Sequence, residues 1–263
     1  MPWKKHPFHL VTISPWPLIC SLNSFNLMIT LIIWFYFKIY WMMMINFTML
    51  MLSMFLWWRD IIRESTYQGQ HSQTIKKMLK FSMILFIISE LMFFISFFWT
   101  YFHMMLSPSI EIGMNWPPKN IIMFNPYKFP LLNSLILISS GMTLTWSHYC
   151  LMNKKYFMSK ILLFLTIMLG MIFSFIQYIE YYEAPFSIND STFSSIFFLM
   201  TGFHGLHVFI GIIFLLTCFI RMLMNHFSNY HHFNFESSSW YWHFVDVIWL
   251  LLYIIIYWWN YNN

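Results

Sequence analysis

Long apolar stretches separated by charged residues divide the chain into seven segments. A helix needs about 20 apolar residues to cross the hydrocarbon core of a bilayer. The apolar runs are continuous, whereas the strands of a membrane β-barrel alternate every second residue. Prolines fall between the runs, where helices end. The pattern therefore predicts seven transmembrane helices, near residues 16–36, 40–58, 81–106, 129–153, 161–179, 191–220 and 237–263.

Composition excludes the other main classes of protein. Of the 263 residues, 59% are hydrophobic and only 9% are charged, whereas soluble domains carry about 25% charged residues. So few charges cannot cover a water-soluble globule, and disorder requires low hydrophobicity with high charge. The expected fold class is an all-α integral membrane protein. Abundant Phe and Met beside a single Ala (Ala184) indicate an AT-biased genome, such as that of an organelle.

The basic residues are distributed unevenly between the two sides of the predicted membrane. Lys and Arg concentrate on the inner side of membrane proteins, so the side with eleven of them is expected to be inside, together with the N-terminus. The charged stretch 59–80 is predicted to be an inner loop between an N-terminal part with two helices (1–58) and a five-helix bundle (81–263). The three residues on the other side are Lys38, Lys119 and Lys128, and the eleven are Lys4, Lys5, Arg59, Arg63, Lys76, Lys77, Lys80, Lys154, Lys155, Lys160 and Arg221.

Glu90 lies in the middle of the third predicted span. An ionised acid at this depth costs about 3 kcal/mol on insertion scales. One interpretation is an acid that takes part in proton movement. The other is a protonated or paired acid buried between helices. One acid alone does not make a proton path, and the residues leave both interpretations open.

Polar side chains in the sixth and seventh spans repeat one spacing. His204 and His207 are three residues apart, as are His243 and Asp246, and such pairs share a helix face. We expect His207 or His204 to pair with Asp246 or Glu90 across helices. Zinc requires four ligands and haem a preset histidine geometry, and the partner motifs are absent, so packing is expected rather than metal binding.

Glycines mark the sixth span as a site of close packing. Only seven glycines occur in the chain, and Gly202, Gly205 and Gly211 all fall in this span. Small residues allow membrane helices to approach closely. A tight helix–helix contact is therefore predicted here.

Two groups of basic and aromatic residues flank predicted spans on the inner side. Such groups can hold anionic lipid headgroups. The simpler explanation is that the aromatic residues anchor the helices at the membrane interface and the basic residues follow the usual enrichment of Lys and Arg on the inner side. Spacing alone slightly favours anchoring. The first group contains Trp58, Arg63, Glu64 and His71, and the second contains Arg221, His226 and His231.

Several sequence motifs of the chain resemble those of a known family. The strings WWRDIIRESTYQGQH, SELMFFISFFWTYFH, STFSSIFFLMTGFHGLHV, HHFNFE and WYWHFVDVIWLLLYIIIYWW together resemble cytochrome c oxidase subunit III of mitochondria, over essentially the whole chain. The resemblance implies seven transmembrane helices, with helices 1–2 separated from helices 3–7 by a lipid-filled cleft. It implies the mitochondrial inner membrane, with the N-terminus in the matrix and the C-terminus in the intermembrane space.

The resemblance also implies a function and a set of partners. The chain would belong to an oxidase that transfers electrons from cytochrome c to oxygen and pumps protons. It would stabilise the catalytic subunit, bind structural phospholipids and support proton uptake, with no cofactor or metal of its own. Haem a and copper would belong to subunits I and II, and further small subunits would complete the complex. No nucleic-acid partner is expected.

The resemblance assigns the family's residue roles only to positions of this sequence that match the family's motifs. Glu90 matches the family's carbodiimide-reactive intramembrane acid. The two basic and aromatic groups match lipid-contacting stretches, so the resemblance reverses the preference for simple anchoring. A stand-alone proton-coupled transporter or channel that uses Glu90 and Asp246 is the alternative, although the chain lacks the repeats and broken helices of transporters. A seven-helix receptor would place the N-terminus outside, against the distribution of Lys and Arg.

Overall fold

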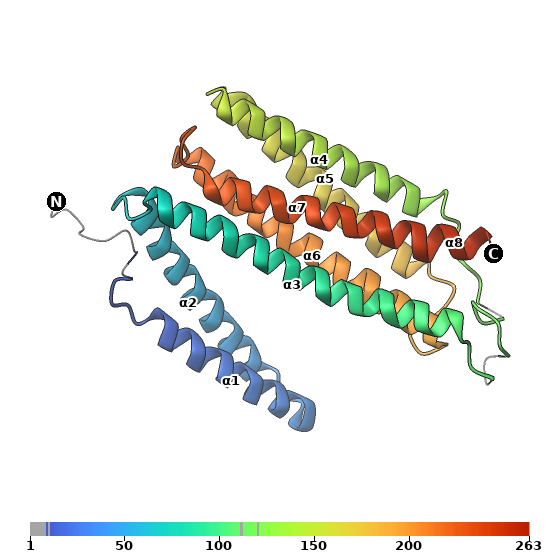
Figure 1. Cartoon of the computed structure of the whole chain (residues 1–263). Helices are drawn as coiled ribbons and strands as arrows, with labels where there is room; N and C mark the ends of the chain where they lie inside the picture. Colours follow the sequence, from blue (N-terminus) through green and yellow to red (C-terminus); the bar gives the residue numbers. More distant parts are fainter. Residues whose placement is uncertain (1–8, 10, 111–112, 120, 263) are drawn as a thin grey trace. The chain divides into compact units, whose positions relative to one another are not determined.

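The computed structural model describes residues 9, 11–110, 113–119 and 121–262. Lys4 and Lys5, which contribute to the predicted orientation, lie outside these residues. Within the described part the chain is helical and forms no named strand. Seven helical segments are long and apolar enough to cross a membrane, which confirms the predicted fold class. The helices are α1 (Trp16–Phe37), α2 (Trp41–Thr66), α3 (Gln73–Leu106), α4 (Phe129–Met152), α5 (Tyr156–Tyr182), α6 (Thr192–Leu223), α7 (Phe233–Leu252), the π-helix η2 (Tyr253–Trp258) and α8 (Trp259–Asn262) (Figure 1).

Most of the helices extend beyond the predicted spans. Helix α2 continues to Thr66 and α3 begins at Gln73, so most of the segment 59–80, expected to be a loop, is helical. Charged residues mark where a segment leaves the hydrocarbon core, and they do not interrupt helical hydrogen bonding. Likewise, the last membrane segment continues from α7 through η2 without a break, up to Tyr261.

The chain contains two compact units, and the first is Met1–Leu79. In this unit α1 packs against α2. Polar side chains join the two helices: Cys20 Sγ lies 3.3 Å from Ser53 Oγ, and Asn23 Nδ2 donates to the same oxygen at 3.2 Å. The large aliphatic and aromatic residues of both helices are mostly exposed. The apolar surface of this unit is therefore suited to lipid or to other subunits.

The second unit is Lys80–Asn263, and its core lies among α4, α5, α6 and α7. Helix α4 packs against α5 and α7, and α6 packs against the same two helices. Two tryptophans of α7 are fully buried: Trp242 Nε1 donates to Ser140 Oγ at 2.9 Å, and Trp249 Nε1 donates to Ser134 Oγ at 3.1 Å. Each indole therefore fills space in the core while its N–H group is hydrogen-bonded.

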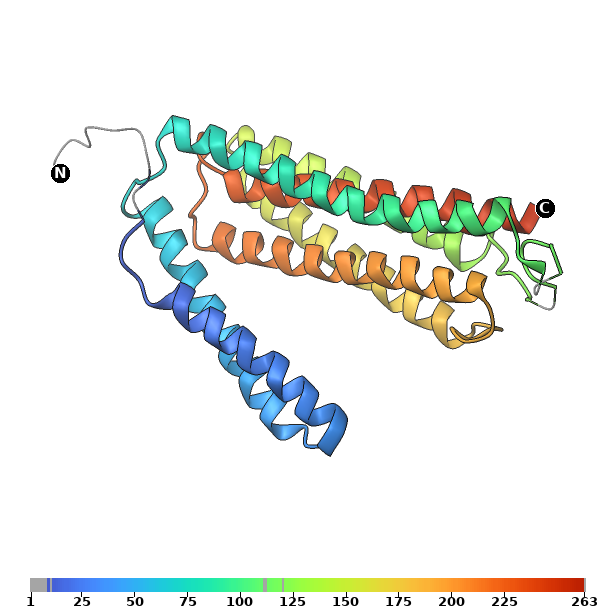
Figure 2. The same cartoon turned by 60° about the horizontal axis from the view of Figure 1, so that its bottom comes forward.

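Helix ends that were predicted to share the inner side lie together in the second unit. Lys80 near the start of α3 forms an ion pair with Glu236 near the start of α7. Lys160 near the start of α5 donates to Asn225, just after α6. The connections from α4 to α5 and from α6 to α7 lie at one end of this bundle, and the connection from α5 to α6 lies at the other (Figure 2).

The close packing predicted for the glycines of α6 is confirmed at only one position. A Cβ at Gly211 would lie 2.9 Å from the indole of Trp242, so only glycine fits without a shift. At Gly202 the nearest atom would be 3.6 Å away, and at Gly205 no atom of the described residues lies within 4 Å, so the prediction is wrong for these two. Helix α5 contributes Gly170 instead, where a Cβ would lie 2.7 Å from Trp242.

Candidate functional site

The carboxyl group of Glu90 on α3 meets the imidazole of His207 on α6. Glu90 Oε2 lies 3.0 Å from His207 Nε2. His207 is buried, and the Glu90 side chain is 27% exposed. At 1.5 Å per residue, Glu90 lies about 15 Å along the helix from Lys80. The predicted pairing of a histidine of the sixth span with Glu90 is confirmed.

This contact requires a bound proton. His207 Nδ1 lies 2.6 Å from the carbonyl oxygen of Phe203. A carbonyl oxygen only accepts, so Nδ1 carries a hydrogen and Nε2 of a neutral ring has only a lone pair. An ionised carboxylate also has only lone pairs. The hydrogen bond at Nε2 therefore needs one more proton, carried either by Glu90 as a carboxylic acid or by His207 as an imidazolium.

Aromatic rings surround the imidazole of His207. Phe94 lies edge-on with a centroid distance of 5.0 Å, and Phe93 and Tyr241 stack at 6.2 Å and 6.4 Å. Charges are poorly solvated in such an apolar setting, and hydrogen bonds are stronger there than in water. The surroundings therefore hold the imidazole in place beside Glu90.

Of the two acids offered as partners, Asp246 forms no pair across helices among the described residues. Its Oδ2 lies 3.5 Å from His243 Nδ1 on the same helix. The reason is the direction of this face of α7: the Asp246 carboxyl group lies over Gly141 of α4, where a Cβ would be 2.9 Å from Oδ2. The sequence spacing identified a local pair and could not reveal which neighbouring helix it faces.

His204 pairs with neither acid. It is buried, and neither ring nitrogen has a hydrogen-bond partner among the described residues. The ring lies 5.1 Å from Trp249 and meets Phe173 edge-on at 5.7 Å. His204 therefore packs against aromatic rings in the core.

Sequence reasoning missed Glu180 on α5. It is completely buried, and neither carboxylate oxygen has a hydrogen-bond partner among the described residues. The predicted fifth span stopped one residue earlier, so this acid was placed outside the membrane. Gln177, three residues before it on the same helix, is also buried, and this polar pair at helical spacing was the available signal.

In the first basic and aromatic group, Glu64 attaches the N-terminal segment to α2. Glu64 Oε1 accepts a hydrogen bond from the Thr12 hydroxyl at 2.7 Å, and Oε2 lies 3.0 Å from His9 Nε2. The His9 ring in turn meets His71 edge-on at 6.1 Å. Glu64 is buried. These contacts give Glu64 and His71 an internal role in the first unit.

Trp58 and Arg63 instead point outward from α2. The Trp58 residue is 54% exposed and the Arg63 side chain is 55% exposed. Arg63 contacts Asp60 at 3.4 Å, and an exposed pair of this kind contributes little stability. Both side chains are accessible to lipid, in contrast to Glu64.

In the second group, Arg221 is a buried cation without a carboxylate partner among the described residues. It is only 9% exposed, and its guanidinium carbon lies 4.8 Å from the centre of the Phe227 ring. In the part of the chain that the structure describes, its Nε has no hydrogen-bond partner. His226 follows α6, and burial together with the charge of Arg221 lowers its pKa. His231 lies in the same connection, where its backbone N–H donates to Ser228 Oγ at 3.0 Å.

A pocket of about 280 Å³ lies beside this second group. The Lys160 ammonium donates to Asn225 Oδ1 at the pocket. An uncompensated guanidinium and an ammonium near one small pocket form a positive region suited to an anionic headgroup. The lining residues are Tyr156, Met222, Asn225 and Phe227.

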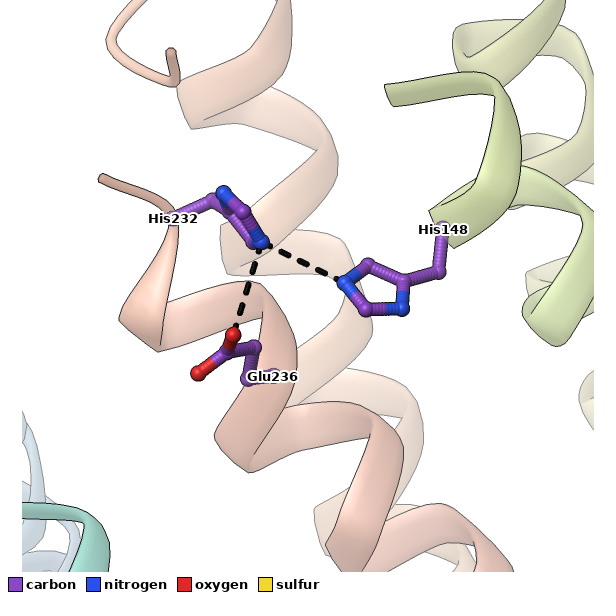
Figure 3. A group of neighbouring side chains, drawn as sticks. All are labelled: His148, His232 and Glu236. Carbon is purple, nitrogen blue, oxygen red and sulfur yellow. Dashed lines mark hydrogen bonds and ion pairs between the residues drawn. The ribbon is translucent and has the colours of Figure 1, made fainter. Parts of the chain in front are cut away.

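Three further polar side chains meet at the same end of the second unit. His232 and Glu236 lie one turn apart at the start of α7, and His148 comes from the last turns of α4. Figure 3 shows His232 between the other two side chains. Sequence reasoning did not single out this cluster. The spacing of His232 and Glu236 was a signal, but His148 is brought to them only by the fold.

Comparisons with known proteins identify the family. The model of the family "Cytochrome c oxidase subunit III" matches residues 6–261. The chain is similar to cytochrome c oxidase subunit 3 of Locusta migratoria (52% identical, 97% of each chain covered) and of Drosophila melanogaster (51%, 97% and 98%). It is also similar to that of Aepyceros melampus (51%, 99% of this chain and 100% of the relative). The chain belongs to the cytochrome c oxidase subunit III family.

As a member of the cytochrome c oxidase subunit III family, the chain is a subunit of the respiratory oxidase, an oxidoreductase complex with other subunits. This confirms the resemblance found in the sequence and decides against a stand-alone transporter. Membership of this family and the seven membrane-spanning helices are consistent with the mitochondrial inner membrane. Glu90 and His207 thus belong to a subunit of a respiratory oxidase.

Proposed function

We propose that this chain supports the oxidase without carrying a redox centre. It stabilises the catalytic subunit I, contacts subunit II and further small subunits, and binds structural phospholipids, while haem a and copper are held by subunits I and II. Its N-terminus lies in the matrix and its C-terminus in the intermembrane space. Its own chemical contribution is to sustain proton uptake by the catalytic subunit.

The proton-bearing contact between Glu90 and His207 carries this proposal. Because the Nδ1 hydrogen of His207 is directed to the Phe203 carbonyl, the pair must hold an additional proton. The Glu90 side chain remains partly exposed on the surface of its unit. A pair that shares a proton at a partly exposed position within the membrane can tune proton uptake in a neighbouring subunit.

The lipid role is supported by the surroundings of Arg221. A buried charge without a partner is costly, and a phosphate would compensate the guanidinium through bidentate hydrogen bonds. Lys160 adds a second positive charge near the adjoining pocket. Arg221, Lys160 and the neighbouring His226 would together receive the headgroup of an anionic phospholipid.

The stabilising role is supported by exposed apolar helix surfaces. In the most apolar 18-residue stretch of α3, only 11% of the residues are buried within the chain, and in that of α2 only 6% are. Such surfaces are covered by lipid or by other membrane helices. They offer the area that a subunit needs to pack against partners.

The test compares proton uptake in complexes that carry Glu90→Gln with those of the wild type. The amide of glutamine can donate to His207 Nε2, so the subunit should remain bound, but it cannot exchange a proton. We expect slower turnover at alkaline pH and fewer protons pumped per electron in vesicles. Asp246→Asn is the control, because Asp246 pairs within its own helix. Wild-type turnover and pumping by Glu90→Gln at every pH would contradict the proposal.

A further inference from the structure

The cluster of His148, His232 and Glu236 has the spacing of metal ligands. His148 Nε2 lies 3.3 Å from His232 Nε2, and His232 Nε2 lies 3.5 Å from Glu236 Oε1. One ligand atom from each residue lies within 4.8 Å of the other two. Zinc binds nitrogen and oxygen at about 2.0–2.1 Å in a tetrahedron, so two of its ligand atoms are about 3.3 Å apart. The three side chains match this separation along two edges.

The imidazole of His232 is oriented as a metal ligand. Its Nδ1 lies 3.0 Å from the Ser228 carbonyl oxygen, which only accepts, so Nδ1 carries the hydrogen. The lone pair of a neutral His232 ring is therefore on Nε2, directed at the cluster. Histidines that bind metals characteristically donate their other ring nitrogen to a carbonyl or carboxylate in this way.

The other two side chains are also held in place. The His148 ring stacks on Phe235 with a centroid distance of 5.5 Å and an interplanar angle of 20°. The ammonium of Lys80 contacts Glu236 Oε2. This ion pair fixes the carboxylate by its far oxygen and leaves Oε1 facing the two histidines.

One repulsion within the cluster would be relieved by a cation, although the Lys80 ammonium already offsets part of the Glu236 charge. The Nε2 lone pair of a neutral His232 and the Glu236 Oε1 atom are both electron-rich, so they repel each other at 3.5 Å. A proton on His232 or a metal ion between the groups removes this repulsion. The His232 side chain is only 5% exposed, and that of Glu236 is 18% exposed. Partly buried ligands that approach each other from two helices suit a metal ion.

We propose that His148, His232 and Glu236 form a binding site for a divalent zinc-like ion. Two imidazole nitrogens and one carboxylate oxygen supply three ligands, and water completes the tetrahedron. The ion would link the last turns of α4 to the first turn of α7 and hold these two helix ends together. The site differs from the histidines that the sequence singled out, since His207 faces Glu90 and His243 faces Asp246.

The first experiment uses the intact wild-type oxidase complex. The complex is treated with a chelator, dialysed, and equilibrated with zinc buffered at a low free concentration. Anomalous scattering at the zinc edge should show an ion between the three side chains, with two nitrogen ligands and one carboxylate oxygen at about 2.0–2.2 Å. Absence of zinc at this position in the intact wild-type complex would overturn the proposal.

A second measurement counts zinc in variant complexes by equilibrium dialysis. Because partner subunits can bind metals as well, the informative quantity is the difference between variants. We expect complexes with His148→Gln or Glu236→Gln to bind one zinc ion fewer than the wild type. His103→Gln is the matched control, because His103 is an exposed histidine in the last turn of α3.

Haem absorption and the amount of this subunit in each complex show whether a variant has assembled. If assembled His148→Gln and Glu236→Gln complexes bind as much zinc as the wild type, the cluster is a proton-bridged network and the proposal is wrong. The outcome does not depend on proton pumping or lipid binding. It therefore remains informative if the proposed function fails.

Discussion

The indole of Trp242 occupies the space that a side chain at Gly211 would need. A Cβ at Gly211 would lie 2.9 Å from Trp242 Cε3, and one at Gly170 would lie 2.7 Å from Cη2. The ring is thus held between α5 and α6, while its Nε1 donates to Ser140 on α4. A single α7 side chain joins the other three helices of the core.

Gly211→Ala is expected to destabilise the second unit. The added methyl group must displace a fully buried ring, and overpacking of this kind costs about 1–3 kcal/mol. Thermal unfolding of the complex in mild detergent, followed by loss of this subunit, should occur at lower temperature. Gly205→Ala on the same helix is the control, because its Cβ meets nothing within 4 Å. Equal stability of the two variants would contradict this account of the packing.

Arg221→Gln is expected to reduce the amount of phospholipid that copurifies with the complex. The substitution removes the buried charge that a phosphate would compensate. Native mass spectrometry should show the loss of one bound anionic lipid. Lys154→Gln removes the same charge from an exposed position near the same end of the unit. The Lys154→Gln complex should retain the bound lipid. Unchanged lipid content in Arg221→Gln would argue against a headgroup at this position.

Glu180 is expected to be a neutral carboxylic acid at neutral pH. The carboxyl group is fully buried and neither oxygen has a hydrogen-bond partner among the described residues, so the neutral form avoids the cost of burying a charge. Infrared spectra should contain a protonated carboxyl band that disappears in Glu180→Gln, while the thermal stability of the complex changes little. A strong loss of stability in Glu180→Gln, with no change in the carboxyl band, would show that the acid is ionised and paired.

Asp190 should make the connection between α5 and α6 sensitive to acid. Hydrogen bonds from the Ser187 backbone N–H and hydroxyl, at 2.6 Å and 2.7 Å, lower the pKa of Asp190. A carboxyl group whose pKa is lower in the folded state stabilises the fold above its unfolded pKa, about 3.9. This contribution is lost as the pH falls through the folded pKa.

Hydrogen exchange measures this loss. Protection of the backbone around Ser187 should decrease below the usual pKa of aspartate, before protection of the adjoining helices decreases. Asp190→Asn should show reduced protection already at neutral pH, with a weaker dependence on acid. Protection that is independent of pH in the wild type would show that the Asp190 charge does not hold this turn.

The sequence alone was sufficient for the seven membrane-spanning helices and the family. Hydrocarbon thickness fixes how many apolar residues a span requires, so seven long apolar runs predict seven helices. Glu90 was identifiable because an acid in the middle of such a run is costly. Helix ends were harder to predict from the sequence. The charges of 59–80 mark the edge of the bilayer, whereas α2 continues to Thr66.

The partners of individual side chains were decided by the tertiary structure. The sequence offered His204 and His207 equally, but only His207 faces Glu90, while His204 packs on Trp249. Gly211 and Gly205 look equivalent along the chain, and only Gly211 meets an indole.

His148 lies more than eighty residues before His232, and only the packing of α4 against α7 brings the two together. The physical reason is that the hydrophobicity and charge of a segment depend only on which residues it contains, so both can be read from the sequence. Contacts between helices depend instead on how each helix is rotated about its axis, which follows from the mutual fit of side chains from all of its neighbours.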